Sequence, residues 1–334
     1  MENQTIVFFE IESWVQPYIK QQLHPHICIF VTEPLSEKNA HKASKATILV
    51  IFIYSRITLT MLKKMPYLQM IATTSTGYNH IQKSVREKIT VCNVPCYGKN
   101  TVAEFAFMLL LALSKKLLSS ERQLKKQTVS HKQLTGLDLT NKTLGIIGTG
   151  NIGMHMAKMA HGFGMHLYAY DKCKNQNLIN TYHIRYAGLA TVLKKSDFIS
   201  LHMPLTETTH HIINQETLTY IQPHALIINT ARGELIDTKA LYNALKSKHI
   251  GGAALDVLEE ECLFSKRITQ LHKKYPGLCK KRLLTLEKKL IQLPNVLVTP
   301  HNAYNTQEAL LRIIDTTIEN IKAFLCNKPI NQVV

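Results

Sequence analysis

Short apolar runs alternate with polar, helix-compatible segments along the first hundred residues. The apolar runs that predict strands are residues 5–9, 27–31, 46–51, 68–73 and 90–94. The segments between them that predict helices are residues 13–22, 36–43, 58–64 and 80–87. Strands that alternate with helices are typical of a parallel sheet. This part of the chain is therefore predicted to form an open α/β domain.

The same alternation returns after residue 142. Further strands are predicted at residues 144–147, 166–170, 198–202, 225–229, 252–255 and 295–299, and helices at 189–195, 238–247 and 306–325. Residues 102–118 predict a long helix that is apolar on nearly every side, with a capping box formed by Thr101 and Glu104. The second series is predicted to form a doubly wound parallel sheet.

Three glycines follow the strand predicted at residues 144–147. Gly148, Gly150 and Gly153 have the spacing at which a strand turns sharply, approaches a pyrophosphate and packs against the next helix. Asp171 ends the following strand, where its carboxylate would accept hydrogen bonds from ribose hydroxyls and repel a 2′-phosphate. This pattern predicts a dinucleotide site that prefers NAD, although Lys172 and Lys174 leave NADP open.

Composition narrows the class of protein. The chain has 334 residues and 45% hydrophobic residues, enough for two folded domains. Its apolar runs are shorter than the ~20 residues that a membrane span needs, and no secretory leader pattern opens the sequence. Its seven cysteines lack the spacing of a metal or redox motif. We expect a cytoplasmic protein with reduced thiols and no metal site.

The formal charge of +17 raises the question of nucleic acid. Lysines are spread along the chain, and the one dense basic stretch lies within residues 262–293. No helix-turn-helix, zinc finger or RNA-binding motif accompanies it, so we interpret it as a solvated surface. A positive field would also attract a dinucleotide or a small carboxylate.

Candidate catalytic groups follow three later strands. Arg232 comes soon after the strand at 225–229, where a guanidinium can grip a carboxylate, although an isolated arginine is more often a surface cation. Asp256 and the acids at 259–261 follow the next strand, and a solvated loop is the alternative for them. His301 follows the last strand and is the acid/base candidate, since imidazole titrates near neutral pH.

Ordered motifs then give a resemblance that covers almost the entire chain. The matching stretches are residues 148–153 with Asp171, 202–205, 228–233, 251–257 and 299–301, together with Ser-Thr-Gly-Tyr-Asn-His-Ile and Asn-Val-Pro-x-Tyr in the first part. The sequence resembles the D-isomer-specific 2-hydroxyacid dehydrogenases. After residue 257 it is most similar to the branch of D-lactate dehydrogenases and vancomycin-resistance D-2-hydroxyacid dehydrogenases.

The resemblance implies a role for each matching residue. Arg232 would bind the substrate carboxylate, His301 would be the general acid/base, and Glu261 would pair with His301. The implied cofactor contacts are Gly148, Thr149, Gly150, Asn151, Ile152, Gly153, Asp171, Met203, Pro204, Thr209, Thr230, Ala231 and Asp256. The implied substrate contacts are Ser75, Thr76, Gly77, Tyr97, Arg232 and Tyr304.

The family also implies an architecture and a partner. Residues 1–100 and 301–334 would form a discontinuous substrate domain, and residues 101–300 an inserted NAD-binding Rossmann domain. Both would be Rossmann-like α/β domains, with a hinge cleft between them. A homodimer would form through the NAD-binding domain.

The implied activity is NAD-dependent reduction of a small 2-keto acid, with pyruvate reduced to D-lactate as the leading prediction. Two departures from the family pattern bear on it: Cys262 stands where many relatives have proline, and Thr74 where several D-lactate enzymes have arginine. The alternatives are a hydroxypyruvate or glyoxylate reductase, a phosphoglycerate dehydrogenase, and an NAD(H)-sensing binding protein of the corepressor type.

Overall fold

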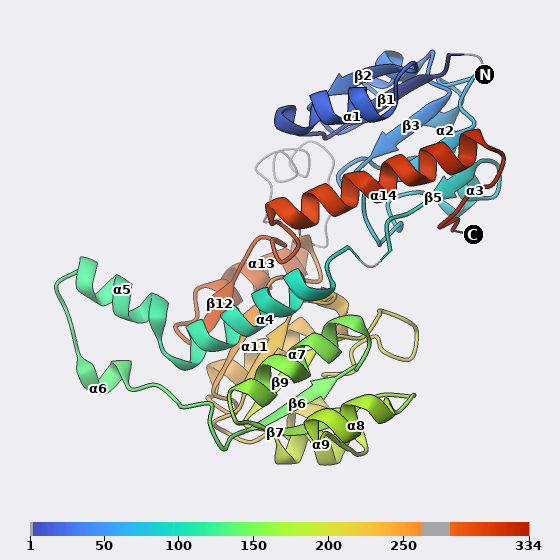
Figure 1. Cartoon of the computed structure of the whole chain (residues 1–334). Coiled ribbons are helices and arrows are strands. Elements are labelled where there is room, and N and C mark those ends of the chain that lie inside the picture. Colours follow the sequence, from blue (N-terminus) through green and yellow to red (C-terminus); the bar gives the residue numbers. More distant parts are fainter. Residues whose placement is uncertain (1–2, 96, 262–280, 334) are drawn as a thin grey trace. The chain divides into compact units, whose positions relative to one another are not determined.

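The chain folds into two compact units (Figure 1). A computed structural model describes residues 3–95, 97–261 and 281–333. One unit comprises Met1–Tyr97 with Thr306–Val334, and the other comprises Gly98–Asn305. Residues 301–305, which were predicted to belong with the first part of the chain, lie in the second unit. Cys96, Cys262 and most of the basic stretch, residues 262–280, fall outside the described residues.

The first unit contains a five-stranded sheet whose strands are all parallel. Its strands are β1 (Thr5–Phe9), β2 (Ile27–Val31), β3 (Ile48–Ile51), β4 (Met70–Thr73) and β5 (Thr90–Cys92), in the order β2-β1-β3-β4-β5. Its helices are α1 (Gln16–Gln22), α2 (Leu59–Leu62), α3 (Lys83–Arg86) and α14 (Gln307–Leu325), with 3-10 turns at Ser13–Val15 and Ala40–Ala43.

Alternate side chains of each strand enter two different cores, because successive side chains point to opposite faces of a sheet. Val7 and Phe9 of β1 pack with α2 and α3 on one face. Ile6 and Phe8 pack with α1 and α14 on the other face. The C-terminal helix therefore completes a core that residues 1–97 alone would leave open.

Buried amides fasten the C-terminal segment to β5. Asn93 N donates to Asn331 O, and Val333 N donates to Val91 O, at 3.0 and 2.8 Å. Asn320, which is fully buried in α14, donates to Asn93 O and accepts from Asn331 Nδ2, both at 2.8 Å. These bonds satisfy polar groups that would be costly to bury alone.

The second unit contains a seven-stranded parallel sheet. Its strands are β6 (Thr143–Ile147), β7 (His166–Tyr170), β8 (Arg185–Tyr186), β9 (Phe198–Leu201), β10 (Leu226–Asn229), β11 (Gly252–Leu255) and β12 (Val296–Val298). Their order is β12-β11-β10-β9-β6-β7-β8. The sequence analysis did not predict the two-residue strand β8.

Helices cover both faces of this sheet (Figure 1). They are α4 (Lys99–Ser114), α5 (Leu117–Lys125), α6 (His131–Leu134), α7 (Asn151–Gly162), α8 (Gln176–Tyr182), α9 (Leu189–Lys195), α10 (Gln215–Leu218), α11 (Thr238–Lys246) and α13 (Lys281–Ile291), with a 3-10 turn at Gly233–Leu235. Helices α4 and α7 pack on one face, and α9, α11 and α13 on the other. The doubly wound α/β prediction is confirmed. No helix within the described ranges is long and apolar enough to cross a membrane.

The long apolar helix differs from its prediction. The chain leaves the helical path at Lys116, whose φ is +56°, so α4 and α5 are separate helices. Helix α4 begins at Lys99 with Gly98 as its N-cap residue and no side-chain cap. The predicted capping box is wrong, because Thr101 lies inside the helix and is buried.

We expect Asn320→Ala to destabilise the first unit, because it removes a buried amide and leaves Asn93 O and Asn331 Nδ2 without the bonds that this amide makes. The expected loss of unfolding free energy is ~1–3 kcal/mol, measured by urea denaturation. Hydrogen exchange should accelerate at the backbone amides of Asn93 and Val333. Glu319→Ala, an exposed position on the same helix, is the control. Equal stability of the two variants would contradict the bridging role of Asn320.

Candidate active site

Four neighbouring strands of the second unit bring several of the predicted site residues to one edge of the sheet. Strands β11, β10, β9 and β6 are adjacent and parallel, so their carboxyl ends face the same way. Ligands of open α/β sheets bind at this edge. The loops after these strands carry the glycines, residues 202–209, Arg232 and Asp256.

The structure gives the three glycines different tasks. Gly148 has a φ of +97°, and a Cβ there would lie 2.8 Å from the backbone of His202 and Met203. A Cβ on Gly153 would lie 2.1 Å from the carbonyl oxygen of Gly148, so the first turn of α7 requires glycine. A Cβ on Gly150 would meet nothing within 4 Å. The fold itself needs the outer two glycines, and the middle one leaves open space at the start of α7.

Groups at this sheet edge suit a pyrophosphate and its nucleosides. The N-terminus of α7, which Asn151 and Ile152 begin, offers backbone N–H groups and the positive end of the helix dipole. The buried hydroxyl of Thr230, after β10, has no hydrogen-bond partner within the described part of the chain. Buried polar groups are normally paired, so such a hydroxyl fits a ligand contact. The residues present therefore fit a dinucleotide.

The loop after β9 is held together by its own polar groups. Thr209 Oγ1 donates to Pro204 O and accepts from Thr206 N, both at 2.7 Å. His202 Nε2 lies 2.8 Å from Ser200 Oγ, and burial lowers the pKa of His202 to about 3. A neutral imidazole therefore stands at the start of this loop. Met203 and Pro204 follow it, half-buried and exposed respectively.

Asp171 accepts hydrogen bonds from the glycine loop. Its carboxylate accepts from Thr149 N at 2.6 Å, Thr149 Oγ1 at 3.0 Å and Cys173 N at 3.0 Å. Burial raises the pKa of Asp171, but these bonds and one from the Lys172 backbone outweigh it, so the pKa lies below its ordinary value. A fixed negative charge at the end of β7 disfavours a 2′-phosphate. The exposed residues Lys172 and Lys174 follow Asp171 closely in the sequence.

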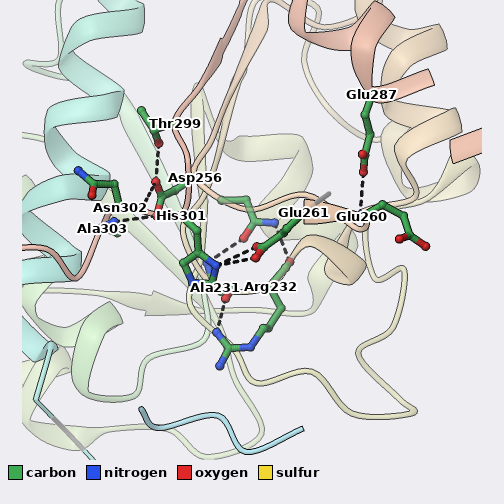
Figure 2. A network of polar contacts seen from close by, with 11 residues as sticks. Ala231, Arg232, Asp256, Glu260, Glu261, Glu287, Thr299, His301, Asn302 and Ala303 are labelled. Carbon is green, nitrogen blue, oxygen red and sulfur yellow. Dashed lines mark hydrogen bonds and ion pairs between the residues drawn. The ribbon is translucent and has the colours of Figure 1, made fainter. Parts of the chain in front are cut away.

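His301 and Glu261 form an ion pair at the same sheet edge (Figure 2). His301 Nδ1 lies 2.9 Å from the Glu261 carboxylate. About a quarter of the histidine side chain and a third of the glutamate side chain are exposed, 26% and 35%. His301 has a φ of +52°, a left-handed conformation that is uncommon for a residue with a side chain.

The buried carboxylate of Asp256 holds His301 in this conformation. It accepts hydrogen bonds from Thr299 Oγ1 and, at 2.8 Å each, from the backbone N–H groups of Asn302 and Ala303. Asp256 O also accepts from His301 N at 2.8 Å. Asp256 has no exposed surface. Its contact with the cofactor stays a prediction, and the contacts that the structure gives it are those that hold the histidine loop.

Arg232 lies in the loop that leaves β10. Asn229 accepts from Ala231 N at 3.0 Å and donates to Arg232 O at 2.8 Å, which fixes the backbone on both sides of Thr230. Arg232 Nη1 donates to Ala231 O at 2.6 Å (Figure 2). The side chain is half-buried. The structure therefore places a guanidinium on a rigid loop after β10, and the Glu261–His301 pair on loops after the adjacent strands β11 and β12.

The three consecutive glutamates make different contacts. Glu259 pairs with His211 Nε2 at 2.8 Å and accepts from Thr238 N at 2.9 Å. Glu260 N donates to the Glu287 carboxyl at 2.8 Å, whereas Glu261 alone contacts His301. The sequence analysis did not identify His211 or Glu287. The sequence did hold a signal for Glu287: it is an acid between Leu284 and Leu290 at the three-residue spacing of one helix face, which predicts a buried carboxyl.

The predicted substrate residues lie in both units, and each group is described within its own unit. In the first unit, Ser75 Oγ donates to Gly77 O at 2.6 Å, and Thr76 O accepts from buried Asn93 at 2.8 Å. Tyr97 O accepts from Arg312 Nε at 2.9 Å. In the second unit, the Tyr304 ring stands nearly perpendicular to that of His301, at 6.5 Å.

Across residues 3–95, 97–261 and 281–333, no group of three or more His, Cys, Asp or Glu side chains could hold a metal ion.

The glycines give a paired prediction for cofactor binding. Gly150→Ala should leave thermal stability nearly unchanged but weaken NADH binding at least ~10-fold, because the new Cβ fills only space that a ligand would use. Gly153→Ala should lower the melting temperature by several degrees, since its Cβ meets backbone. Fluorescence titration with NADH and thermal unfolding measure the two effects. Unchanged NADH binding in Gly150→Ala would refute this placement of the pyrophosphate.

Comparisons with known proteins identify the family of this chain. The family model "D-isomer specific 2-hydroxyacid dehydrogenase, NAD binding domain" matches residues 107–303. A 2-hydroxyacid dehydrogenase homolog of Zymomonas mobilis is 35% identical over 303 residues, covering 89% of this chain and 88% of the relative. A glyoxylate reductase of Thermococcus litoralis is 32% identical, covering 95% and 88%.

The fold comparison gives the same result. The crystal structure of a D-lactate dehydrogenase from Aquifex aeolicus, complexed with NAD and lactic acid, superposes with a TM-score of 0.84. It is 34% identical, and the match covers 97% of this chain and 96% of that one. The chain belongs to the D-isomer specific 2-hydroxyacid dehydrogenases, NAD-dependent oxidoreductases that act on the CH–OH group of 2-hydroxy acids.

Proposed function

We propose that this protein reduces a small 2-keto acid with NADH, with pyruvate as the preferred substrate and D-lactate as the product. The observation that carries the proposal is the His301–Glu261 ion pair, with Nδ1 2.9 Å from the carboxylate, at the sheet edge that also bears Arg232. This reaction needs three groups: an acid/base, a partner that favours the charged form of that acid/base, and a cation that binds the substrate carboxylate.

Each residue has one role in the proposed mechanism. NADH, when bound, supplies the hydride. Arg232 binds the substrate carboxylate and, by its positive charge, polarises the neighbouring carbonyl. His301 donates the proton from Nε2 to the carbonyl oxygen, because Nδ1 is engaged by Glu261. Glu261 stabilises the imidazolium before transfer and keeps the ring oriented, as a carboxylate partner of histidine does.

The proposed substrate contacts are the backbone and side chains of Ser75, Thr76 and Gly77, with Tyr97 and Tyr304. The loop 75–77 is held by the Asn93 amide on Thr76 O and by Ser75 Oγ on Gly77 O, so its backbone is fixed before substrate arrives. His80 also supports this loop, because its ring lies 3.1 Å from Thr73 Oγ1, two residues before Ser75. Burial lowers the pKa of His80 to about 4.

A second candidate substrate is glyoxylate or hydroxypyruvate. It is favoured by the glyoxylate reductase of Thermococcus litoralis among the relatives and by Thr74, which stands where several D-lactate enzymes have arginine. A pocket discriminates a methylene group by only ~1–3 kcal/mol, so these small keto acids differ little in the binding energy available to separate them.

We also propose a homodimer that forms through the NAD-binding unit. Helices α5 and α6 extend away from the sheet of their unit (Figure 1). No side chain of α5 is buried, and Leu117, Leu118 and Leu124 are 58%, 44% and 69% exposed. Exposed apolar side chains gathered on one arm are typical of an interface. A second copy of the chain would cover them.

The catalytic assignment predicts that His301→Gln and Arg232→Ala each lower the turnover of pyruvate by ~100-fold to 10,000-fold while NADH binding persists. Initial rates with pyruvate, glyoxylate and hydroxypyruvate test substrate and mechanism together. His41→Gln, at an exposed position of the first unit, is the control. Near-normal turnover in both variants would refute the assignment, and faster turnover of glyoxylate by wild type would favour the second candidate.

The dimer predicts that Leu124→Asp yields a folded monomer, because the side chain is already exposed in the single chain and a charge is disfavoured only in an apolar interface. Sedimentation equilibrium measures the mass, and Tyr67→Asp, at a 64% exposed position of the first unit, should remain dimeric. A wild-type protein that sediments as a monomer would exclude this interface.

A further inference from the structure

A carboxylic acid interrupts the apolar face of α13. Leu284, Glu287 and Leu290 follow each other at intervals of three residues and are 7%, 0% and 1% exposed. Such spacing puts the three side chains on one side of a helix. Glu287 therefore points into the protein between two core leucines, where a charged group is costly.

A hydrogen bond joins this buried acid to the candidate active site. Glu287 Oε1 accepts from the backbone N–H of Glu260 at 2.8 Å, and Glu260 directly precedes Glu261, the partner of His301 (Figure 2). Within the described part of the chain, Glu287 Oε2 has no hydrogen-bond partner. The acid thus fixes the backbone one residue before Glu261.

The charged groups around Glu287 favour its neutral form. Burial raises the pKa of Glu287 most, the bond from Glu260 N lowers it, and the negative charges at 259–261 raise it, to about 8. Helix α11, which packs on α13, turns its lysines to solvent, and β12 carries no ionisable residue. The basic residues that are exposed on the two helices are Lys239 and Lys246 of α11, and Arg282, Lys288 and Lys289 of α13. Tyr242 of α11 is half-buried under Lys246, and His211 is occupied by Glu259.

We propose that Glu287 is a positioning residue for the Glu261–His301 pair: as a neutral acid it anchors the Glu260 backbone, and when ionised it repels the acidic loop. The proposal rests on the proposed function for the roles of Glu261 and His301. Neutral Glu287 keeps Glu261 in contact with His301. Ionised Glu287 adds a fourth negative charge to this loop, and the three acids above it move away.

Two substitutions separate the anchor from the charge. Glu287→Gln keeps an oxygen that accepts from Glu260 N but cannot ionise. Glu287→Leu fits the apolar face but leaves that N–H without its acceptor. Lys288→Gln, at the exposed neighbouring position, is the control for a change of one charge on the same helix.

Steady-state reduction of pyruvate is then measured from pH 6 to 10. At pH 6.5 we expect Glu287→Gln to keep kcat within ~2-fold of wild type, and Glu287→Leu to lose ~10-fold in kcat with KM within ~2-fold, since Arg232 still binds the carboxylate. At pH 9 wild type should fall ~10-fold below Glu287→Gln, because about one molecule in ten then keeps the neutral acid. Equal pH profiles of wild type and Glu287→Gln, or full activity of Glu287→Leu, would overturn the proposal.

Thermal unfolding without substrate gives a readout that does not depend on catalysis. A carboxyl whose pKa is raised by folding binds more protons in the folded state, so wild type loses stability as pH rises from about 4.5 to about 8, with no further loss above that. The melting temperature of Glu287→Gln should exceed that of wild type by a margin that widens over this range.

The two readouts distinguish the two proposals. A margin that does not change with pH would overturn the neutral Glu287 even if catalysis proceeds as proposed. A widening margin in a protein that reduces none of the three keto acids would support the buried neutral acid and would refute the proposed function alone.

Discussion

The candidate active site depends on one buried carboxylate, that of Asp256. It accepts hydrogen bonds from Thr299 Oγ1 and from two successive backbone N–H groups, those of Asn302 and Ala303. A fully buried negative charge is stable only when donors surround it, so the loop must wrap around the carboxylate. That wrapping places His301, which lies between the donors, in a left-handed conformation. The position of His301, the proposed acid/base, thus follows from the hydrogen bonds that the Asp256 carboxylate needs.

Carboxylates dominate the short segment after β11, and the fold separates them by giving each a different environment. Asp256 is buried among N–H donors, and Glu259 is paired with His211. Glu261 is partly exposed and paired with His301. Like charges at such close range disfavour one another, and in a low-dielectric surrounding the cost rises. Burial and the negative charges of Glu259, Glu260 and Glu261 together raise the pKa of Glu287 to about 8, so this acid carries the cost of their proximity.

The glycine turn between β6 and α7 is subject to a different constraint, which is steric. A side chain on Gly148 would collide with the backbone of His202 and Met203, and one on Gly153 would collide with the backbone of Gly148, so both positions require glycine. Gly150 meets no such obstacle within the protein. Its lack of a side chain is consistent with a ligand that comes close to the backbone. The same turn brings Thr149 to Asp171, so the glycine loop and the carboxylate that is predicted to bind the ribose are fixed together.

The sequence by itself determined the two parallel sheets, the glycine turn and the family, because these depend on local periodicity and on motifs of adjacent residues. It placed most strands within a residue or two, although it missed β8, continued α4 past the left-handed Lys116, and put a cap at Thr101 inside the helix. The resemblance already named Glu261 as the partner of His301. Only the tertiary structure decided the geometry of that contact, how Asp256 holds the histidine loop, and that Glu287 reaches Glu260. Those contacts join residues 27 to 47 positions apart, and their geometry depends on the packing of strands and helices that no local pattern records.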